Sequence, residues 1–126
     1  MPHPPHSLGK KVIEQEAWAL RSLSNSIGES FDLAVDMLLG SRGHVVVSGV
    51  GKSGHIGRKL ASTFTSTGTP SLYLHPTEAS HGDLGIIQIG DVVLALSRSG
   101  ESPELKDTLL YCKQNSVSLI GIVVSP

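Results

Sequence analysis

The sequence lacks most of the features that mark secreted, membrane or nucleic-acid-binding proteins. Its single cysteine, Cys112, excludes an internal disulfide and shares a helical face with Leu105 and Leu109, which predicts a small buried residue. No apolar run approaches the roughly 20 residues that cross a bilayer, and no stretch resembles a signal peptide. The net charge of −1 provides no broad basic surface for nucleic acid or anionic membranes. We therefore expect a cytoplasmic protein with neither kind of partner.

The composition that remains is that of one globular domain. With 126 residues, of which 39% are hydrophobic and 17% charged, the chain can bury one core. Residues 1–9 contain three prolines and are expected to form a disordered tail. Two amphipathic helices are expected from Lys10 onward, and Ser26 with Glu29 predicts a capping box at the start of the second.

Strand and helix patterns alternate from His44 onward. Apolar strands are expected at residues 44–48, 71–75, 91–97 and 118–124, with helices at 54–67 and 103–115. This alternation predicts an α/β fold in which helices cover both faces of a parallel sheet, a three-layer α/β/α sandwich. In such sheets the ligand site lies beyond the carboxyl ends of the strands, where the strand order reverses.

A glycine-rich turn, SGVGKSG at residues 48–54, joins the first strand to a helix. Such a turn leaves backbone N–H groups unpaired and facing outward, where they bind phosphate. Lys52 lies inside the turn and His55, Arg58 and Lys59 follow it, so a bound anion would offset their unfavourable interaction with the helix dipole. The alternative is that these are solvated side chains, which suits Arg58 and Lys59 better than Lys52.

Two nucleotide-binding motifs partly match this turn. Gly49, Gly51 and Gly54 have the spacing of the dinucleotide fingerprint, but no acidic residue ends the second strand to hold a ribose hydroxyl. A Walker A loop would need a glycine where Val46 stands, which excludes that motif. Dinucleotide binding therefore remains only as an alternative.

A second turn, SRSGESPE at residues 97–104, follows the third strand. It offers three hydroxyl groups, a glycine that permits close backbone approach, and a helix start with Ser102 as N-cap and Pro103 in the first position. Helix capping by Ser102 and a favourable first-turn charge at Glu104 are purely structural alternatives. Two such turns at the ends of two central strands favour a shared phosphate site over capping alone.

The connection between the second and third strands is rich in titratable groups. Glu78, His81 and Asp83 suit acid–base chemistry or a metal. A zinc ion shared by His75 and His81 is a weaker hypothesis, because spacing alone does not fix metal geometry. The position of His75 at a strand end favours a hydrogen-bonded structural histidine.

Together these stretches resemble the sugar isomerase (SIS) domain of D-arabinose 5-phosphate isomerases. The matching segments are GVGKSGHIGRK at 49–59, STGTP at 66–70, HPxEAxHGDLG at 75–85 and SxSGES at 97–102. The resemblance implies a flavodoxin-like sheet, a homotetramer with sites shared between subunits, and no required cofactor. It also implies interconversion of D-ribulose 5-phosphate and D-arabinose 5-phosphate, for synthesis of the lipopolysaccharide sugar Kdo.

The resemblance assigns roles by position. The residues expected to bind substrate and its phosphate are Gly49, Gly51, Ser53, Ser97, Ser99, Gly100 and Ser102. Lys52 and Glu104 are expected at the reacting end of the sugar, and His81 is expected to be a catalytic residue that can also bind inhibitory zinc. Isomerisation moves a proton between neighbouring carbons through an enediol, so it needs a base and a cation for the oxyanion. Lys52 suits the cation, and Glu104 or a histidine suits the base.

The sequence departs from this family at its C-terminus. Family members continue with another strand, helices bearing a histidine thought to act as the base, and usually two CBS domains, so we expect residues 10–126 to form a partial SIS domain. The four strands, in the expected order 2-1-3-4, would leave the last as an apolar edge through which the chain assembles or aggregates. A non-catalytic module that senses sugar phosphates is the alternative, and it would need the serines but not Lys52 and Glu104.

Overall fold

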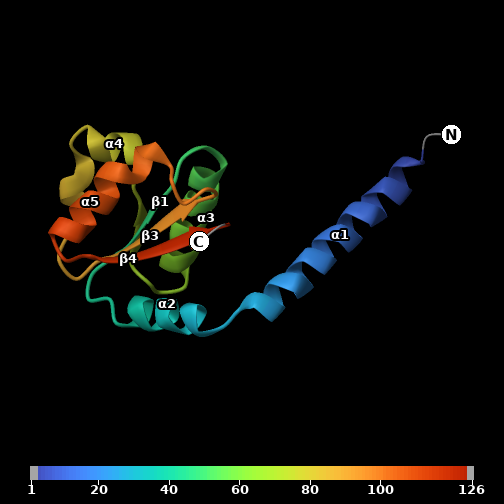
Figure 1. Cartoon of the computed structure of the whole chain (residues 1–126), viewed down its shortest axis with the longest axis horizontal. Helices are drawn as coiled ribbons and strands as arrows, with labels where there is room; N and C mark the ends of the chain where they lie inside the picture. Colours follow the sequence, from blue (N-terminus) through green and yellow to red (C-terminus); the bar gives the residue numbers. More distant parts are fainter. Residues whose placement is uncertain (1–2, 125–126) are drawn as a thin grey trace. The chain divides into compact units, whose positions relative to one another are not determined.

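The chain divides into two compact units, Met1–Leu33 and Ala34–Pro126, and the computed structural model describes residues 3–124. Figure 1 shows the elements along the chain. None of the helices in this part of the chain has the length and apolar character of a membrane span. The elements are α1 (Pro5–Ser26), α2 (Glu29–Leu39), β1 (Val45–Ser48), α3 (Gly51–Ser66), β2 (Ser71–Tyr73), α4 (Pro76–Ser80), the 3-10 helix η1 (Asp83–Ile86), β3 (Val92–Ser97), the 3-10 helix η2 (Pro103–Leu105), α5 (Lys106–Gln114) and β4 (Ser118–Val123).

Helix α1 starts earlier than the sequence predicted. The tail expected over residues 1–9 is wrong for residues 5–9, which are helical, while residues 1–2 lie outside the described range. Pro5 occupies the first helical position, where its missing N–H loses no hydrogen bond and its fixed φ suits the helix. One of the three prolines on which the tail was predicted thus begins a helix.

The predicted capping box does not form. Ser26 ends α1, and its hydroxyl donates a hydrogen bond to the Leu23 carbonyl at 2.8 Å. Helix α2 begins at Glu29, and Glu29 and Asp32 place negative charge in its first turn. The Ser26 hydroxyl is therefore engaged by its own helix and is not used by the next one.

The four strands form one parallel sheet in the order β2-β1-β3-β4, which confirms the predicted order. Val45 pairs with Ser71 of β2 and Val92 of β3, and Val92 pairs with Ser118 of β4. All four carboxyl ends therefore lie at one edge of the sheet, where the turns after β1 and β3 also begin.

The sheet separates two apolar clusters. Val45 and Val47 of β1 belong to one cluster and Val46 belongs to the other, because successive side chains of a strand point to opposite faces. The end of α2 and α3 pack on the first cluster, and α4 and α5 contribute to the second (Figure 1). The predicted three-layer α/β/α sandwich is confirmed, and Cys112 is buried in the second cluster as predicted.

A buried carboxylate, that of Asp91, joins the loops at the amino ends of the strands. Asp91 is 4% exposed and accepts hydrogen bonds from the backbone N–H groups of His44, at 2.7 Å, and Gln88, at 2.8 Å. Gly43 packs so closely that an added Cβ would lie 2.1 Å from a carboxylate oxygen of Asp91. Asp91 therefore joins the segment before β1 to the segment before β3, away from the carboxyl ends of the strands.

Candidate functional site

The turn after β1 is shorter than predicted, because α3 begins at Gly51 rather than Gly54. Gly51 has a φ of +59°, a left-handed conformation that favours glycine, so the chain enters the helix directly after Val50. No side chain caps this helix. Lys52 and Ser53 therefore lie in the first turn of α3, where backbone N–H groups have no intrahelical partner.

Gly54 packs tightly against this turn. A Cβ at this position would lie 2.7 Å from the Gly49 carbonyl oxygen and 2.7 Å from the Tyr73 hydroxyl oxygen. The same Tyr73 hydroxyl donates a hydrogen bond to the Gly49 carbonyl. The turn, the start of α3 and the end of β2 are therefore held together at van der Waals distance.

Ser97, the last residue of β3, organises the second turn. Its hydroxyl lies 2.7 Å from the Ser102 hydroxyl and accepts a hydrogen bond from the Gly100 N–H at 3.0 Å. The Ser99 hydroxyl accepts one from the Glu101 N–H at 3.1 Å. Ser102 occupies the predicted N-cap position of η2, but its hydroxyl makes no capping bond. Capping therefore does not explain the Ser102 side chain.

The two turns line one hollow of about 500 Å³ at the carboxyl edge of the sheet. Ser53 comes from α3, whereas Ser99 and Ser102 come from the turn after β3, and Arg98 adds a positive charge. Hydroxyl donors, a guanidinium group and the start of a helix suit a phosphate group. The lining residues are Val50, Ser53, Arg98, Ser99, Ser102 and Val124.

Four of the predicted binding residues lie outside this lining. Gly51 lines a neighbouring hollow, and Gly49 accepts the Tyr73 hydrogen bond. Ser97 and Gly100 line an apolar hollow of about 150 Å³ beside β4 and α5. Ser97 is buried, so it supports the second turn from inside.

The three residues predicted to be catalytic are exposed and lie in different elements. Lys52 is in the first turn of α3, His81 follows α4, and Glu104 is in η2. Across residues 3–124, no ion pair or side-chain hydrogen bond joins any two of them. Residues of the two turns thus line a common hollow, whereas no such bond joins the three predicted catalytic residues within the described range, and their catalytic roles stay predictions.

Zinc binding at His81 also stays a prediction. In the part of the chain that the structure describes, no three side chains of histidine, cysteine, aspartate or glutamate lie close enough to hold one metal ion. His75 precedes α4, and its Nδ1 accepts a hydrogen bond from the Thr77 N–H at 3.1 Å. This bond confirms the structural role predicted for His75.

Sequence reasoning missed Tyr73. This residue lines a hollow of about 290 Å³ on the other side of the first turn, and the Arg58 guanidinium lies 4.2 Å from its ring centroid. Arg58 is exposed as predicted, yet the aromatic ring holds it in place. Burial raises the pKa of Tyr73, and the nearby Arg58 charge offsets part of that rise. The sequence did contain a signal for Tyr73, because an aromatic residue with a hydroxyl ends the strand expected to lie beside the glycine-rich turn.

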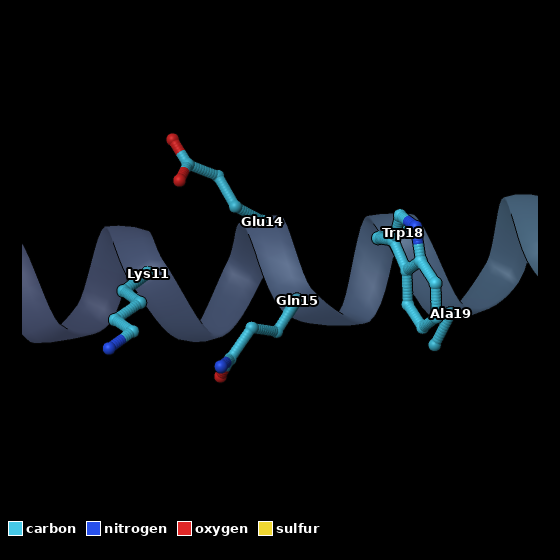
Figure 2. A pocket seen from close by; sticks show the side chains of 5 residues that line it. All are labelled: Lys11, Glu14, Gln15, Trp18 and Ala19. Atoms are coloured by element: carbon cyan, nitrogen blue, oxygen red, sulfur yellow. The ribbon is translucent and has the colours of Figure 1, made fainter.

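A depression on α1 does not form a comparable site. Figure 2 shows its five lining side chains, Lys11, Glu14, Gln15, Trp18 and Ala19, all projecting from the same helix. Trp18 is 71% exposed. One helix face does not enclose a small molecule, so we assign no ligand to it.

Two isomerases share much of this sequence. The chain is 49% identical over 118 residues to arabinose 5-phosphate isomerase KdsD of Escherichia coli K12, covering 94% of this chain and 36% of that protein. It is 48% identical over 117 residues to KdsD of Pseudomonas aeruginosa PAO1, covering 93% of this chain and 36% of that protein. The chain therefore spans little more than a third of the length of these relatives.

Solved structures with the same fold include a protein of Escherichia coli CFT073 in complex with A5P. Its TM-score is 0.80 at 40% identity, covering 96% of this chain and 66% of that chain. The Vibrio vulnificus NanR protein complexed with ManNAc-6P also gives 0.80, but at 18% identity it shows the fold alone. The SIS domain model matches residues 37–126, which include the whole sheet and both turns. The chain therefore belongs to the SIS domain family.

Proposed function

We propose that this chain contributes the phosphosugar-binding part of an aldose–ketose isomerase that interconverts D-ribulose 5-phosphate and D-arabinose 5-phosphate. The observation that carries this proposal is the hollow in which Ser53 meets Ser99 and Ser102. The 49% identity to KdsD, and the similarity to a structure in complex with A5P, support the substrate class.

In this proposal the phosphate occupies the hollow between the two turns. The Ser53, Ser99 and Ser102 hydroxyls would donate to its oxygens, and Arg98 and the first N–H groups of α3 would balance its charge. The phosphate is remote from the reacting carbons, so its binding energy serves to orient C1 and C2 of the sugar.

The reacting end would use the three exposed side chains. A base removes a proton from C1 of the ketose to give an enediol and returns a proton to C2, which yields the aldose. Lys52 would stabilise negative charge on the substrate oxygen, and Glu104 or His81 would move the proton. Zinc at His81 would block that proton transfer.

We also propose that the protein acts as a cytoplasmic homo-oligomer. Strand β4 is an edge of the sheet within the described residues, and Leu119, Ile122 and Val123 expose apolar side chains along it. A second copy would cover this apolar surface. The same assembly would bring further residues to the reacting end of the site.

Turnover of D-ribulose 5-phosphate by the whole chain tests the proposed function. We expect Lys52→Ala to lower kcat by at least about 100-fold, as removal of an oxyanion partner does elsewhere. Lys113→Ala removes an exposed lysine from the last turn of α5, outside the proposed site, and serves as the control with unchanged kcat. Activity of Lys52→Ala equal to that of the parent would remove Lys52 from the mechanism.

Calorimetric titration with both pentose phosphates separates the alternatives. Binding without turnover in the parent chain favours the sensor module over the isomerase. Absence of binding contradicts the phosphosugar proposal altogether. Thermal stabilisation by NAD, without stabilisation by either pentose phosphate, would instead restore the dinucleotide hypothesis.

A further inference from the structure

Tyr73 makes three contacts around the first turn. Its hydroxyl donates a hydrogen bond to the Gly49 carbonyl, its ring face carries the Arg58 guanidinium at 4.2 Å, and its ring lies nearly perpendicular to that of His75, at a centroid distance of 6.4 Å. Because Tyr73 ends β2 and Gly49 follows β1, the hydrogen bond connects two neighbouring strands at the residue where the turn begins.

The hydrogen bond has no substitute within residues 3–124. No other side-chain or loop donor in that range reaches the Gly49 carbonyl. The peptide unit is planar and trans, so the Val50 N–H points opposite to the Gly49 carbonyl and therefore away from Tyr73. Val50 lines the hollow that also contains Ser53, Ser99 and Ser102, and its N–H has no acceptor among the same residues. By holding the Gly49 carbonyl, the Tyr73 hydroxyl therefore also orients the free Val50 N–H.

Close packing leaves the Tyr73 ring little freedom. A Cβ at Gly54 would lie 2.7 Å from the Tyr73 hydroxyl, and one at Gly57 would lie 3.2 Å from its ring. Both glycines are buried in α3. The ring therefore fits only because two glycines one helical turn apart face it, and its position fixes where α3 starts relative to β2.

We propose that Tyr73 is a positioning residue for the phosphosugar site. Its hydroxyl holds the Gly49–Val50 peptide so that the turn presents its N–H groups to the hollow lined by Ser53, Ser99 and Ser102. The effect on ligand binding rests on the proposed function, whereas the effect on the turn does not.

Tyr73→Phe removes the hydroxyl and keeps the ring that carries Arg58. Tyr111→Phe is the matched control, because the other tyrosine of the chain also donates to a carbonyl, that of Ile87 at 3.4 Å, far from the turn. We expect Tyr73→Phe to raise the Kd for D-arabinose 5-phosphate about threefold to tenfold, measured by calorimetry where all chains are folded. Tyr111→Phe should leave this Kd unchanged. Equal Kd values in the parent and Tyr73→Phe would overturn the proposal.

Amide hydrogen exchange provides the readout that needs no ligand. In Tyr73→Phe we expect faster exchange than in the parent at Gly54, whose N–H donates to the Val50 carbonyl at 3.3 Å, with no such change in Tyr111→Phe. If the parent chain binds no pentose phosphate, the proposed function fails and this measurement alone decides the role of Tyr73. Unchanged exchange at Gly54 would then reject that role.

Discussion

Gly54 shows how packing can require a glycine for a reason that the sequence does not reveal. The sequence placed it at the end of a glycine-rich turn whose backbone N–H groups are expected to bind phosphate. In the structure, the atoms that crowd this position belong to the chain itself, the Gly49 carbonyl and the Tyr73 hydroxyl. That contact was not predictable from spacing, because Tyr73 comes from a different strand and the sheet alone brings it to the turn.

Gly54→Ala should lower the free energy of unfolding by about 1–3 kcal/mol, because the added methyl group would collide with the Gly49 carbonyl and with the Tyr73 hydroxyl. Gly85→Ala is the control, since its Cβ would have no neighbour within 4 Å. Urea unfolding of the three chains measures the difference. Equal losses in both variants would contradict the packing argument.

The ionisation of Tyr73 gives a pH prediction. Burial raises the pKa of Tyr73 in the folded chain, so its hydroxyl stabilises the fold below the unfolded pKa and loses that effect as pH rises through the folded pKa. We expect the stability difference between the parent and Tyr73→Phe to stay constant from about pH 6 to 9 and to shrink in stronger alkali. Burial also raises the pKa of the Cys112 thiol, but Cys112 is present in both chains, so its titration cancels in the stability difference. A difference that changes below about pH 9 would assign the effect to another group.

Secondary-structure elements were predicted well in type and order but less well in their boundaries. The four parallel strands and their order followed from the alternation of apolar runs and helical patterns. Helix α3 starts earlier than predicted because Gly51 adopts a positive φ, and the helix expected at 103–115 begins as the 3-10 helix η2. These boundaries depend on backbone conformation and packing that periodicity does not encode.

The loops at the amino edge of the sheet depend on Asp91. Asp91→Ala leaves the His44 and Gln88 N–H groups without their buried acceptor, so we expect a loss of about 2–4 kcal/mol in unfolding free energy. Asp36→Ala, at an exposed position of α2, should change stability by less than about 0.5 kcal/mol. Chemical denaturation tests both, and a small effect of Asp91→Ala would show that water replaces the carboxylate.

At the scale of the whole molecule, the second unit contains both apolar clusters. Every buried member of the two clusters lies between Val45 and Ile120. A shortened chain of residues 28–126 should therefore unfold in one cooperative thermal transition. A peptide of residues 5–26 should be only partly helical in water, because most of the stability of helices in proteins comes from tertiary packing, and α1 has no buried residue. Loss of cooperativity in the shortened chain would show that α1 is needed for folding.

The exposed apolar side chains of β4 make a prediction about assembly. We expect size-exclusion chromatography to give a multiple of the 13.3 kDa chain mass. Ile122→Lys places a charge on the exposed edge and should shift the elution toward the monomer, whereas Leu110→Lys on α5 should not. A stable monomer at micromolar concentration would contradict the oligomer.

The function of the molecule was less accessible from sequence than its fold. Motif resemblance brought the serines of the two turns together correctly, because the topology places both turns at one edge. It also predicted that Lys52, His81 and Glu104 act in one site, but they lie in three separate elements, and neither periodicity nor spacing fixes the distances between them.

The common direction of the strands has a further consequence for how substitutions combine. The hydrogen bonds of Asp91 lie at the amino ends of β1 and β3, and the serine turns, residues 48–54 and 97–104, lie at their carboxyl ends. Substitutions in the serine turns would therefore leave the Asp91 hydrogen bonds in place, so effects on ligand binding at one end and on stability at the other should be close to additive.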